Sequence, residues 1–97
     1  MADGERAAFE AYARTGQRRL YRTAYLLCGD TEGAQDLTQT TLAKLFQHWR
    51  RASRADNLDA YAKTVLVRTF VAERRRSVRD LLAHNRNAPR PQPNPAP

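Results

Sequence analysis

The sequence predicts an all-α protein, a compact bundle of about four helices followed by a disordered Pro-rich C-terminal tail. All five prolines lie in the last nine of the 97 residues, so no proline interrupts a helix before Pro89. Only four glycines occur, and two of them lie in the segment GDTEG, where a turn is expected. We therefore expect a single helical domain over residues 1–84 and a Pro-rich linker or tail over residues 85–97.

Two helices are expected before the GDTEG turn, each with apolar residues at helical spacing. The first covers about Gly4 to Arg14 and ends near Thr15 and Gly16, because glycine is common where a helix ends. The second covers about Gln17 to Cys28. Their apolar sides consist of Ala8, Phe9, Tyr12 and Ala13 in the first helix, and Leu20, Tyr21, Ala24, Leu27 and Cys28 in the second.

A third helix is expected from about Thr31 to Ser53, with Asp30 or Thr31 as its N-cap. One side of this helix is predicted to face the core; it consists of Ala34, Leu37, Thr38, Thr41, Leu45 and Trp49. The short polar segment RASRADN then connects it to a fourth helix, which Asp56 or Asn57 would cap and which runs to about Leu82. Because the first half of the fourth helix is apolar on several sides, we expect it to contact more than one neighbour.

The other side of the third helix carries a large aromatic residue among polar ones. It consists of Gln35, Asp36, Gln39, Ala43, Phe46 and Arg50, with Leu42 on its border. Phe46 could be the anchor of a protein-binding surface, or it could pack under another helix of the same domain. Helical periodicity alone favours neither interpretation.

The net charge of +7 comes entirely from the second half of the chain. Residues 1–49 contain six basic and six acidic residues, whereas residues 50–97 contain eleven basic and four acidic residues. A surplus confined to one half is typical of a surface that binds a polyanion, although a solvated basic face would give the same count.

Other classes of function have little support in the sequence. Cys28 is the only cysteine and has apolar neighbours, so we expect a buried small residue and no disulfide. His48 and His84 have no partners at the spacing of metal ligands or of a catalytic triad. We expect neither an enzyme nor a cofactor, and, without a signal peptide or a membrane-spanning segment, a cytoplasmic location.

Two long segments, RLYRTAYLLCGDTEGAQDLTQTTLAKLFQHW and DAYAKTVLVRTFVAERRR, resemble region 2 of bacterial RNA polymerase sigma factors. The resemblance spans about Phe9 to Arg76 and is nearest to the extracytoplasmic-function (ECF) group of actinobacterial type. It rests on the order of four features: a tyrosine-rich helix, the GD break, the run D-L-x-Q and the run A-Y-x-x-x-V-L-V.

The resemblance implies a fold of the sigma region 2 type and a docking site on RNA polymerase. In this family the helix with D-L-x-Q docks on the clamp helices of the polymerase β′ subunit. The matching positions in this chain are Asp36, Gln39, Thr40, Leu42 and Phe46. Thr40 departs from the glutamate that is often found there. The resemblance favours the interpretation of Phe46 as an interface anchor.

The resemblance also implies promoter recognition, in which the loop before the last helix and the helix itself hold the −10 element as a melted single strand. The residues of this chain that would contact DNA are Arg50, Arg51, Arg54, Asn57, Lys63, Thr64, Arg68, Arg74, Arg75 and Arg76. Of these, Asn57, Thr64, Arg68 and Arg75 align along one side of the helix. Arg68 stands where many relatives carry Asn, which leaves the preferred base open, because Arg only donates hydrogen bonds.

Two further hypotheses differ from promoter recognition. A region-2-like interaction module could sequester the polymerase clamp or an anti-sigma factor without reading DNA. A basic amphipathic helix could lie on a membrane surface, but the core-like apolar residues in all four helices argue against this.

The partners implied by the resemblance are the β′ clamp helices, the −10 non-template strand and an anti-sigma factor. Sigma factors also carry region 4, a helix-turn-helix domain that reads the −35 element. Either this chain is the region 2 part of a longer protein, or the natural protein lacks region 4. The proline tail that ends in mid-run favours a part of a longer protein, but the sequence leaves open whether region 4 follows.

Overall fold

The computed structural model describes residues 3–87, and all its regular elements in this range are helices. These are α1 (Asp3–Cys28), α2 (Thr31–Gln47), α3 (Trp49–Ala52) and α4 (Leu58–Asn87). The predicted all-α fold is therefore confirmed for the described residues. Residues 88–97, which make up most of the predicted tail, lie outside them.

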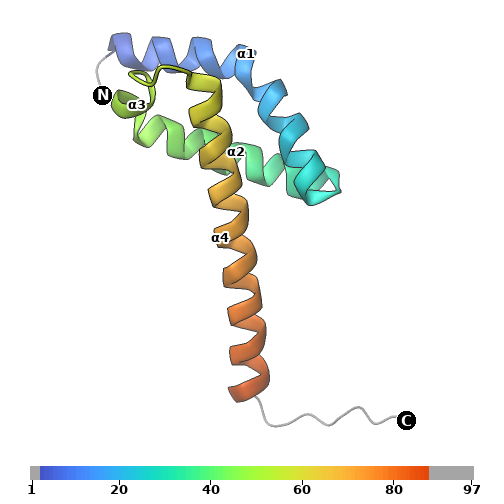
Figure 1. Ribbon diagram of the computed structural model, residues 1–97. Coiled ribbons are helices and arrows are strands. Elements are labelled where there is room, and N and C mark those ends of the chain that lie inside the picture. The colour runs from blue at the N-terminus through green and yellow to red at the C-terminus, as the bar shows by residue number, and fades with distance from the viewer. Residues whose placement is uncertain (1–2, 88–97) are drawn as a thin grey trace.

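The first correction concerns α1, which is one continuous helix where the sequence predicted two. Gly16 does not end the helix; it is a buried residue inside it, and Figure 1 shows the helix curving near its middle. A Cβ atom at Gly16 would lie only 2.7 Å from the Tyr12 ring. The glycine is thus a packing site for an aromatic side chain one turn earlier, and this contact compensates for its poor helix propensity.

The turn between α1 and α2 forms as the sequence predicted. Gly29 adopts a φ of 80°, a left-handed conformation that favours glycine, and its N–H donates to the Tyr25 carbonyl at 2.8 Å. Asp30 is the N-cap of α2, because its carboxylate accepts a hydrogen bond from the Gly33 N–H at 2.6 Å. This turn reverses the chain and lets α2 run back along α1.

The second correction concerns the end of the predicted third helix. Helix α2 stops at Gln47, and His48, with φ −113° and ψ 30°, separates it from the single turn of α3. The short helix α3 buries Trp49 and Ala52. In α4 the predicted cap is confirmed, since the Asn57 side-chain oxygen accepts a hydrogen bond from the Ala60 N–H at 3.0 Å. The helix runs to Asn87, which is five residues beyond its predicted end.

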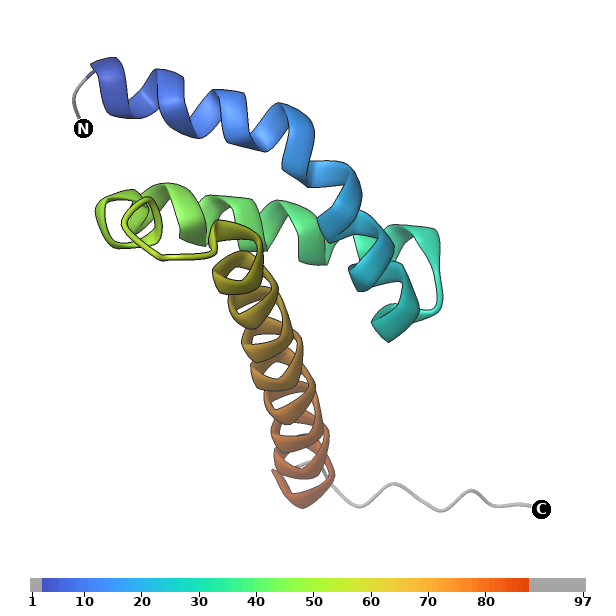
Figure 2. The ribbon, with the colours of Figure 1, turned by 45° about the horizontal axis from the view of Figure 1, so that its top comes forward.

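The core lies where α1, α2 and the first half of α4 meet. Figures 1 and 2 show α1 and α2 side by side, while α4 crosses them and then projects away from the other helices. All six residues predicted on the core side of α2 and α3 are buried, which confirms that stripe. The buried apolar residues are Leu20, Ala24, Ala34, Leu37, Leu42, Leu45, Trp49, Ala52, Ala62 and Leu66. None of the helices in residues 3–87 is long and apolar enough to cross a membrane.

An ion pair joins α1 to the first turn of α4. Arg19 donates a hydrogen bond to the Asp59 carboxylate at 3.0 Å, although both side chains are about half exposed. The Tyr12 hydroxyl is close to the same carboxylate, and burial, followed by the negative charge of Asp59, raises the pKa of Tyr12. This ion pair and the Tyr12 ring lie where the beginning of α4 meets α1.

Candidate functional site

An aromatic cluster joins α1 to α2 and α3. The Phe9 ring packs edge-to-face against Phe46, with centroids 5.1 Å apart, and against Trp49 at 5.5 Å. The Tyr12 ring lies 6.1 Å from Trp49. Contacts of this geometry add stability beyond the apolar area that they bury. Phe46 therefore does pack under another helix of its own domain, which is one of the two interpretations that the sequence left open.

Phe46 also lines an open hollow of about 480 Å³ between α1 and α2. Of the five predicted polymerase-binding residues, the structure brings Gln39, Leu42 and Phe46 together at this hollow. Phe46 is half-buried, so part of its ring remains accessible. The two interpretations of Phe46 are compatible, because one part of the ring contacts Phe9 and another part faces the hollow.

The other two predicted residues lie on α2 outside this hollow. Asp36 is exposed and Thr40 is half-buried. Leu42, although it lines the hollow, is only 8% exposed and packs mainly in the core. The accessible groups on this part of α2 are therefore the side chains of Asp36 and Gln39 and part of the Phe46 ring.

Residues of α1 that the sequence did not assign to the site complete the hollow. They are Arg6, Phe9, Glu10 and Ala13. The Arg6 guanidinium lies 5.9 Å from the centre of the Phe46 ring, where a cation is attracted to the ring face. Helical periodicity placed Phe9 and Ala13 on an apolar side, but nothing in the pattern shows which helix they meet. Two charged side chains of α1, Arg6 and Glu10, thus line the hollow together with the rings of Phe9 and Phe46.

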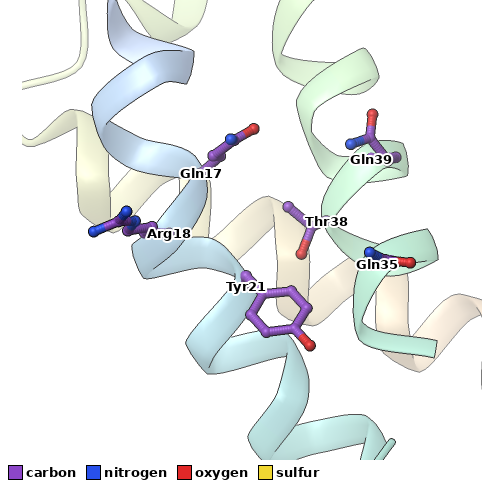
Figure 3. Close-up of a pocket in the computed structure, with 6 residues that line it drawn as sticks. All are labelled: Gln17, Arg18, Tyr21, Gln35, Thr38 and Gln39. Atoms are coloured by element: carbon purple, nitrogen blue, oxygen red, sulfur yellow. The ribbon is translucent and has the colours of Figure 1, made fainter. Parts of the chain in front are cut away.

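A second, more polar hollow of about 230 Å³ lies further along the same two helices. Its lining residues are Gln17, Arg18, Tyr21, Gln35, Thr38 and Gln39 (Figure 3). Figure 3 shows Gln17 and Tyr21 directed toward α2, whereas Arg18 is directed away from it. Gln39 lines both hollows, so they adjoin along the exposed side of α2. We call the five predicted polymerase-binding side chains the docking surface; they are Asp36, Gln39, Thr40, Leu42 and Phe46.

The predicted DNA-binding residues are all exposed, and they begin on α3. Arg50 Nε donates a hydrogen bond to the Glu5 carboxylate of α1 at 3.3 Å, although the Arg50 side chain remains 80% exposed. Arg51 on α3 and Arg54 in the following loop are exposed as well. An ion pair this exposed adds little stability, so Arg50 can exchange its partner for a phosphate group at small cost.

The polar stripe of α4, which consists of Asn57, Thr64, Arg68 and Arg75, faces solvent. The buried residues Ala62, Leu66 and Thr69 occupy the opposite side of the helix. Two members of the stripe already have structural roles. Asn57 caps the helix, and the Thr64 hydroxyl donates to the Ala60 carbonyl at 3.0 Å. Thr64 Oγ1 therefore keeps only acceptor capacity toward a ligand.

The arginines do not form one patch. At 1.5 Å of rise per residue, Arg75 lies about 27 Å along α4 from Asn57, in the half that projects from the body. Arg74 lies over the Phe70 ring, with 5.4 Å between its guanidinium carbon and the ring centre. Lys63 is near the ion pair of Arg19 and Asp59. We call the ten predicted residues the arginine surface; it is an extended ridge with basic groups near both ends.

Catalytic or metal chemistry finds no support in the described part of the chain. Burial, and then the nearby carboxylates of Asp30 and Glu73, raise the pKa of the Cys28 thiol, which disfavours the reactive thiolate. Residues 3–87 contain no cluster of three His, Cys, Asp or Glu side chains that could hold a metal ion. The exposed groups of the two surfaces are suited to binding.

Comparison with known families identifies the domain. Residues 12–80 match the family Sigma-70 region 2, so the chain belongs to that family. This confirms the resemblance on which the expected fold and site residues depend. No solved structure matches the chain significantly.

The similar curated proteins are RNA polymerase sigma-E factors from Streptomyces. The chain is 41% identical to the protein of Streptomyces avermitilis over 69 residues, which is 71% of this chain and 38% of that protein. It is 41% identical to the protein of Streptomyces coelicolor over 66 residues, which is 68% of this chain and 37% of that protein. These relatives agree with the expected ECF group of actinobacterial type. The chain matches less than two fifths of the length of each.

Proposed function

We propose that this chain is the region 2 domain of an RNA polymerase sigma factor that acts in the cytoplasm. It binds the clamp helices of the polymerase β′ subunit through the docking surface. It recognises the −10 promoter element and helps to melt it for transcription initiation through the arginine surface. The domain acts by binding, without catalysis or a cofactor, and an anti-sigma factor is a further partner.

The observation that carries this proposal is the family match combined with the exposure of Asp36, Gln39 and the arginine surface. Residues 12–80, which match the family, include the whole docking surface and the whole arginine surface. Gln39 remains exposed at the hollow that the half-buried Phe46 lines, and Asp36 is exposed about one turn earlier on α2. An aromatic anchor with polar groups around it is typical of the centre of a protein interface.

DNA binding is supported by the chemistry and the shape of the second surface. Arginine stays charged and matches phosphate oxygens with a bidentate fork. The exposed ridge along α4 is long enough to follow a strand, and Thr64 and Arg68 would face bases rather than phosphates. A melted strand exposes base edges that a duplex keeps buried.

The docking half of the proposal can be tested with an isolated β′ clamp fragment. Asp36→Asn removes an exposed charge without changing size, and we expect it to weaken binding by about 1–2 kcal/mol if the charge contacts the clamp. The matched control is Asp80→Asn, which removes the same charge from the projecting half of α4. Equal affinity of the two variants, measured by titration calorimetry, would contradict docking through α2.

A further inference from the structure

Five of the large apolar side chains of α4 are exposed and lie on one side of the helix. They are Val67, Val71, Val78, Leu81 and Leu82, with exposed fractions of 42%, 37%, 56%, 61% and 52%. The spacing from Val67 to Val71, Val78 and Leu82 is four, seven and four residues, which keeps these side chains in register along a helix. We call these five side chains the apolar stripe.

No other described element covers the apolar stripe. The side of α4 that faces the body is marked by the buried residues Ala62, Leu66 and Thr69. Every side chain from Arg74 to His84 is exposed, and Figures 1 and 2 show this half of α4 projecting away from the other helices. A helical segment without tertiary contacts is marginally stable in water. A partner that buried the stripe would stabilise this half of α4.

The charges beside the stripe determine which partner is favoured. Between Val67 and His84 the helix carries five arginines but only two acidic residues, Glu73 and Asp80. A second copy of the chain would bring two strongly basic segments together, which is unfavourable. A helix with Asp and Glu beside its own apolar seam would instead place opposite charges next to the arginines.

A membrane surface fits the stripe less well than a helix does. Helices that lie on membranes have a broad apolar face, often with Trp or Phe. The stripe consists only of Val and Leu side chains, and Arg74 lies among them in sequence and on the same side. A narrow seam of about two apolar residues in seven is the pattern by which one helix packs against another.

We propose that the apolar stripe of α4 binds an amphipathic helix of a protein partner whose apolar seam is flanked by Asp and Glu. At 100° per residue, Arg68 and Arg75 lie at the border of the stripe, next to Val71. The docked helix therefore covers two residues of the arginine surface, Arg68 and Arg75. Partner and promoter strand compete for α4, a consequence that rests on the proposed function, whereas the docking itself does not.

The probe for this proposal is a synthetic peptide of about 28 residues, with Leu at the a and d positions of a heptad repeat and Glu at the flanking e and g positions. The control peptide has the same seam with Lys in place of Glu. We expect the Glu peptide to bind the chain in a fluorescence anisotropy titration and the Lys peptide to bind at least about tenfold more weakly.

The matched variants are the double variant V78Q/L82Q and the control Ala83→Gln, which adds the same amide on the other side of the projecting segment. All three positions are exposed, so circular dichroism should show an unchanged helix content. We expect V78Q/L82Q to weaken binding of the Glu peptide at least about tenfold, and Ala83→Gln to leave it unchanged.

Three results would overturn the proposal. One is equal binding of the Glu peptide by V78Q/L82Q and the original chain. Another is a concentration-dependent dimer of the chain, seen by sedimentation, that V78Q/L82Q abolishes, since it would assign the stripe to a second copy. The third is tight binding to vesicles containing phosphatidylglycerol that V78Q/L82Q abolishes while neither peptide binds.

Competition is measured separately, by adding the Glu peptide to the chain bound to a labelled single-stranded oligonucleotide. We expect the peptide to displace the strand from the original chain but not from V78Q/L82Q. If the chain binds no DNA at all, the proposed promoter function fails, while the titration without DNA still decides whether the helix docks. A ternary complex without displacement would contradict the placement of the partner next to Arg68 and Arg75.

Discussion

Phe46 shows how one side chain can serve both the fold and a surface. Part of its ring packs edge-to-face on Phe9, and another part faces the hollow between α1 and α2. The sequence presented these as alternatives, because helical periodicity gives the direction of a side chain but not the distance to the neighbouring helix. A change at Phe46 should therefore affect both folding and docking.

Phe46→Ala should weaken binding to a β′ clamp fragment by about 2 kcal/mol, because the anchor of the surface is lost. It should also lower the free energy of unfolding by about 1–2 kcal/mol, because the half-buried ring no longer contacts Phe9. Calorimetry and urea denaturation measure the two effects. The control is Leu26→Ala, which truncates a side chain that is 83% exposed on α1. An unchanged affinity for the fragment would show that Phe46 serves the fold alone.

Gly16 offers a second test at the scale of one residue. Gly16→Ala should lower the free energy of unfolding by about 1–2 kcal/mol, because the new methyl group displaces the Tyr12 ring and this outweighs the gain in helix propensity. Gly4→Ala is the control, since nothing lies within 4 Å of a Cβ atom there. If both variants are equally stable or more stable in urea denaturation, the close packing of Tyr12 on Gly16 is wrong.

At the scale of elements, the sequence predicted best where its signals are local. The N-caps Asp30 and Asn57 and the buried side of α2 follow from residue type and spacing, and all are confirmed. The break expected at Gly16 is wrong, because burial of the Tyr12 ring over the glycine depends on contacts with α3 and α4. The interruption at His48 has no proline or glycine to indicate it.

Under the proposed function, α4 makes two kinds of contact with DNA: Thr64 and Arg68 face bases, and Arg75 contacts phosphate. Arg75→Ala should weaken binding to all single strands alike and reduce the salt dependence of the affinity, because Arg75 is expected to contact phosphate. The control is Arg22→Ala, which removes the same charge from an exposed position on α1. Binding isotherms at several salt concentrations measure the slope. An equal loss in both variants would indicate general attraction by net charge and not a defined track along α4.

At the scale of the whole molecule, the fold assembles a surface that no single segment contains. Residues of α1 from Arg6 to Ala13 complete the hollow that Gln39 and Phe46 line from α2. The α2 half of this surface could be predicted, because its residues match a family motif in consecutive turns. The α1 half could not, since it depends on how two helices pack. The arginine surface was predicted residue by residue, but its extended shape follows from the projection of α4.

We propose above that this domain recognises promoter DNA as a single strand. The most direct measurement is selection from a pool of single-stranded oligonucleotides with a randomised −10 region, in the presence of the β′ clamp fragment. We expect enrichment of a defined sequence, weaker binding of that sequence as a duplex, and a different enriched base with Arg68→Asn. An unenriched pool, with scrambled strands competing equally and Arg68→Asn leaving the ranking unchanged, would contradict the proposal.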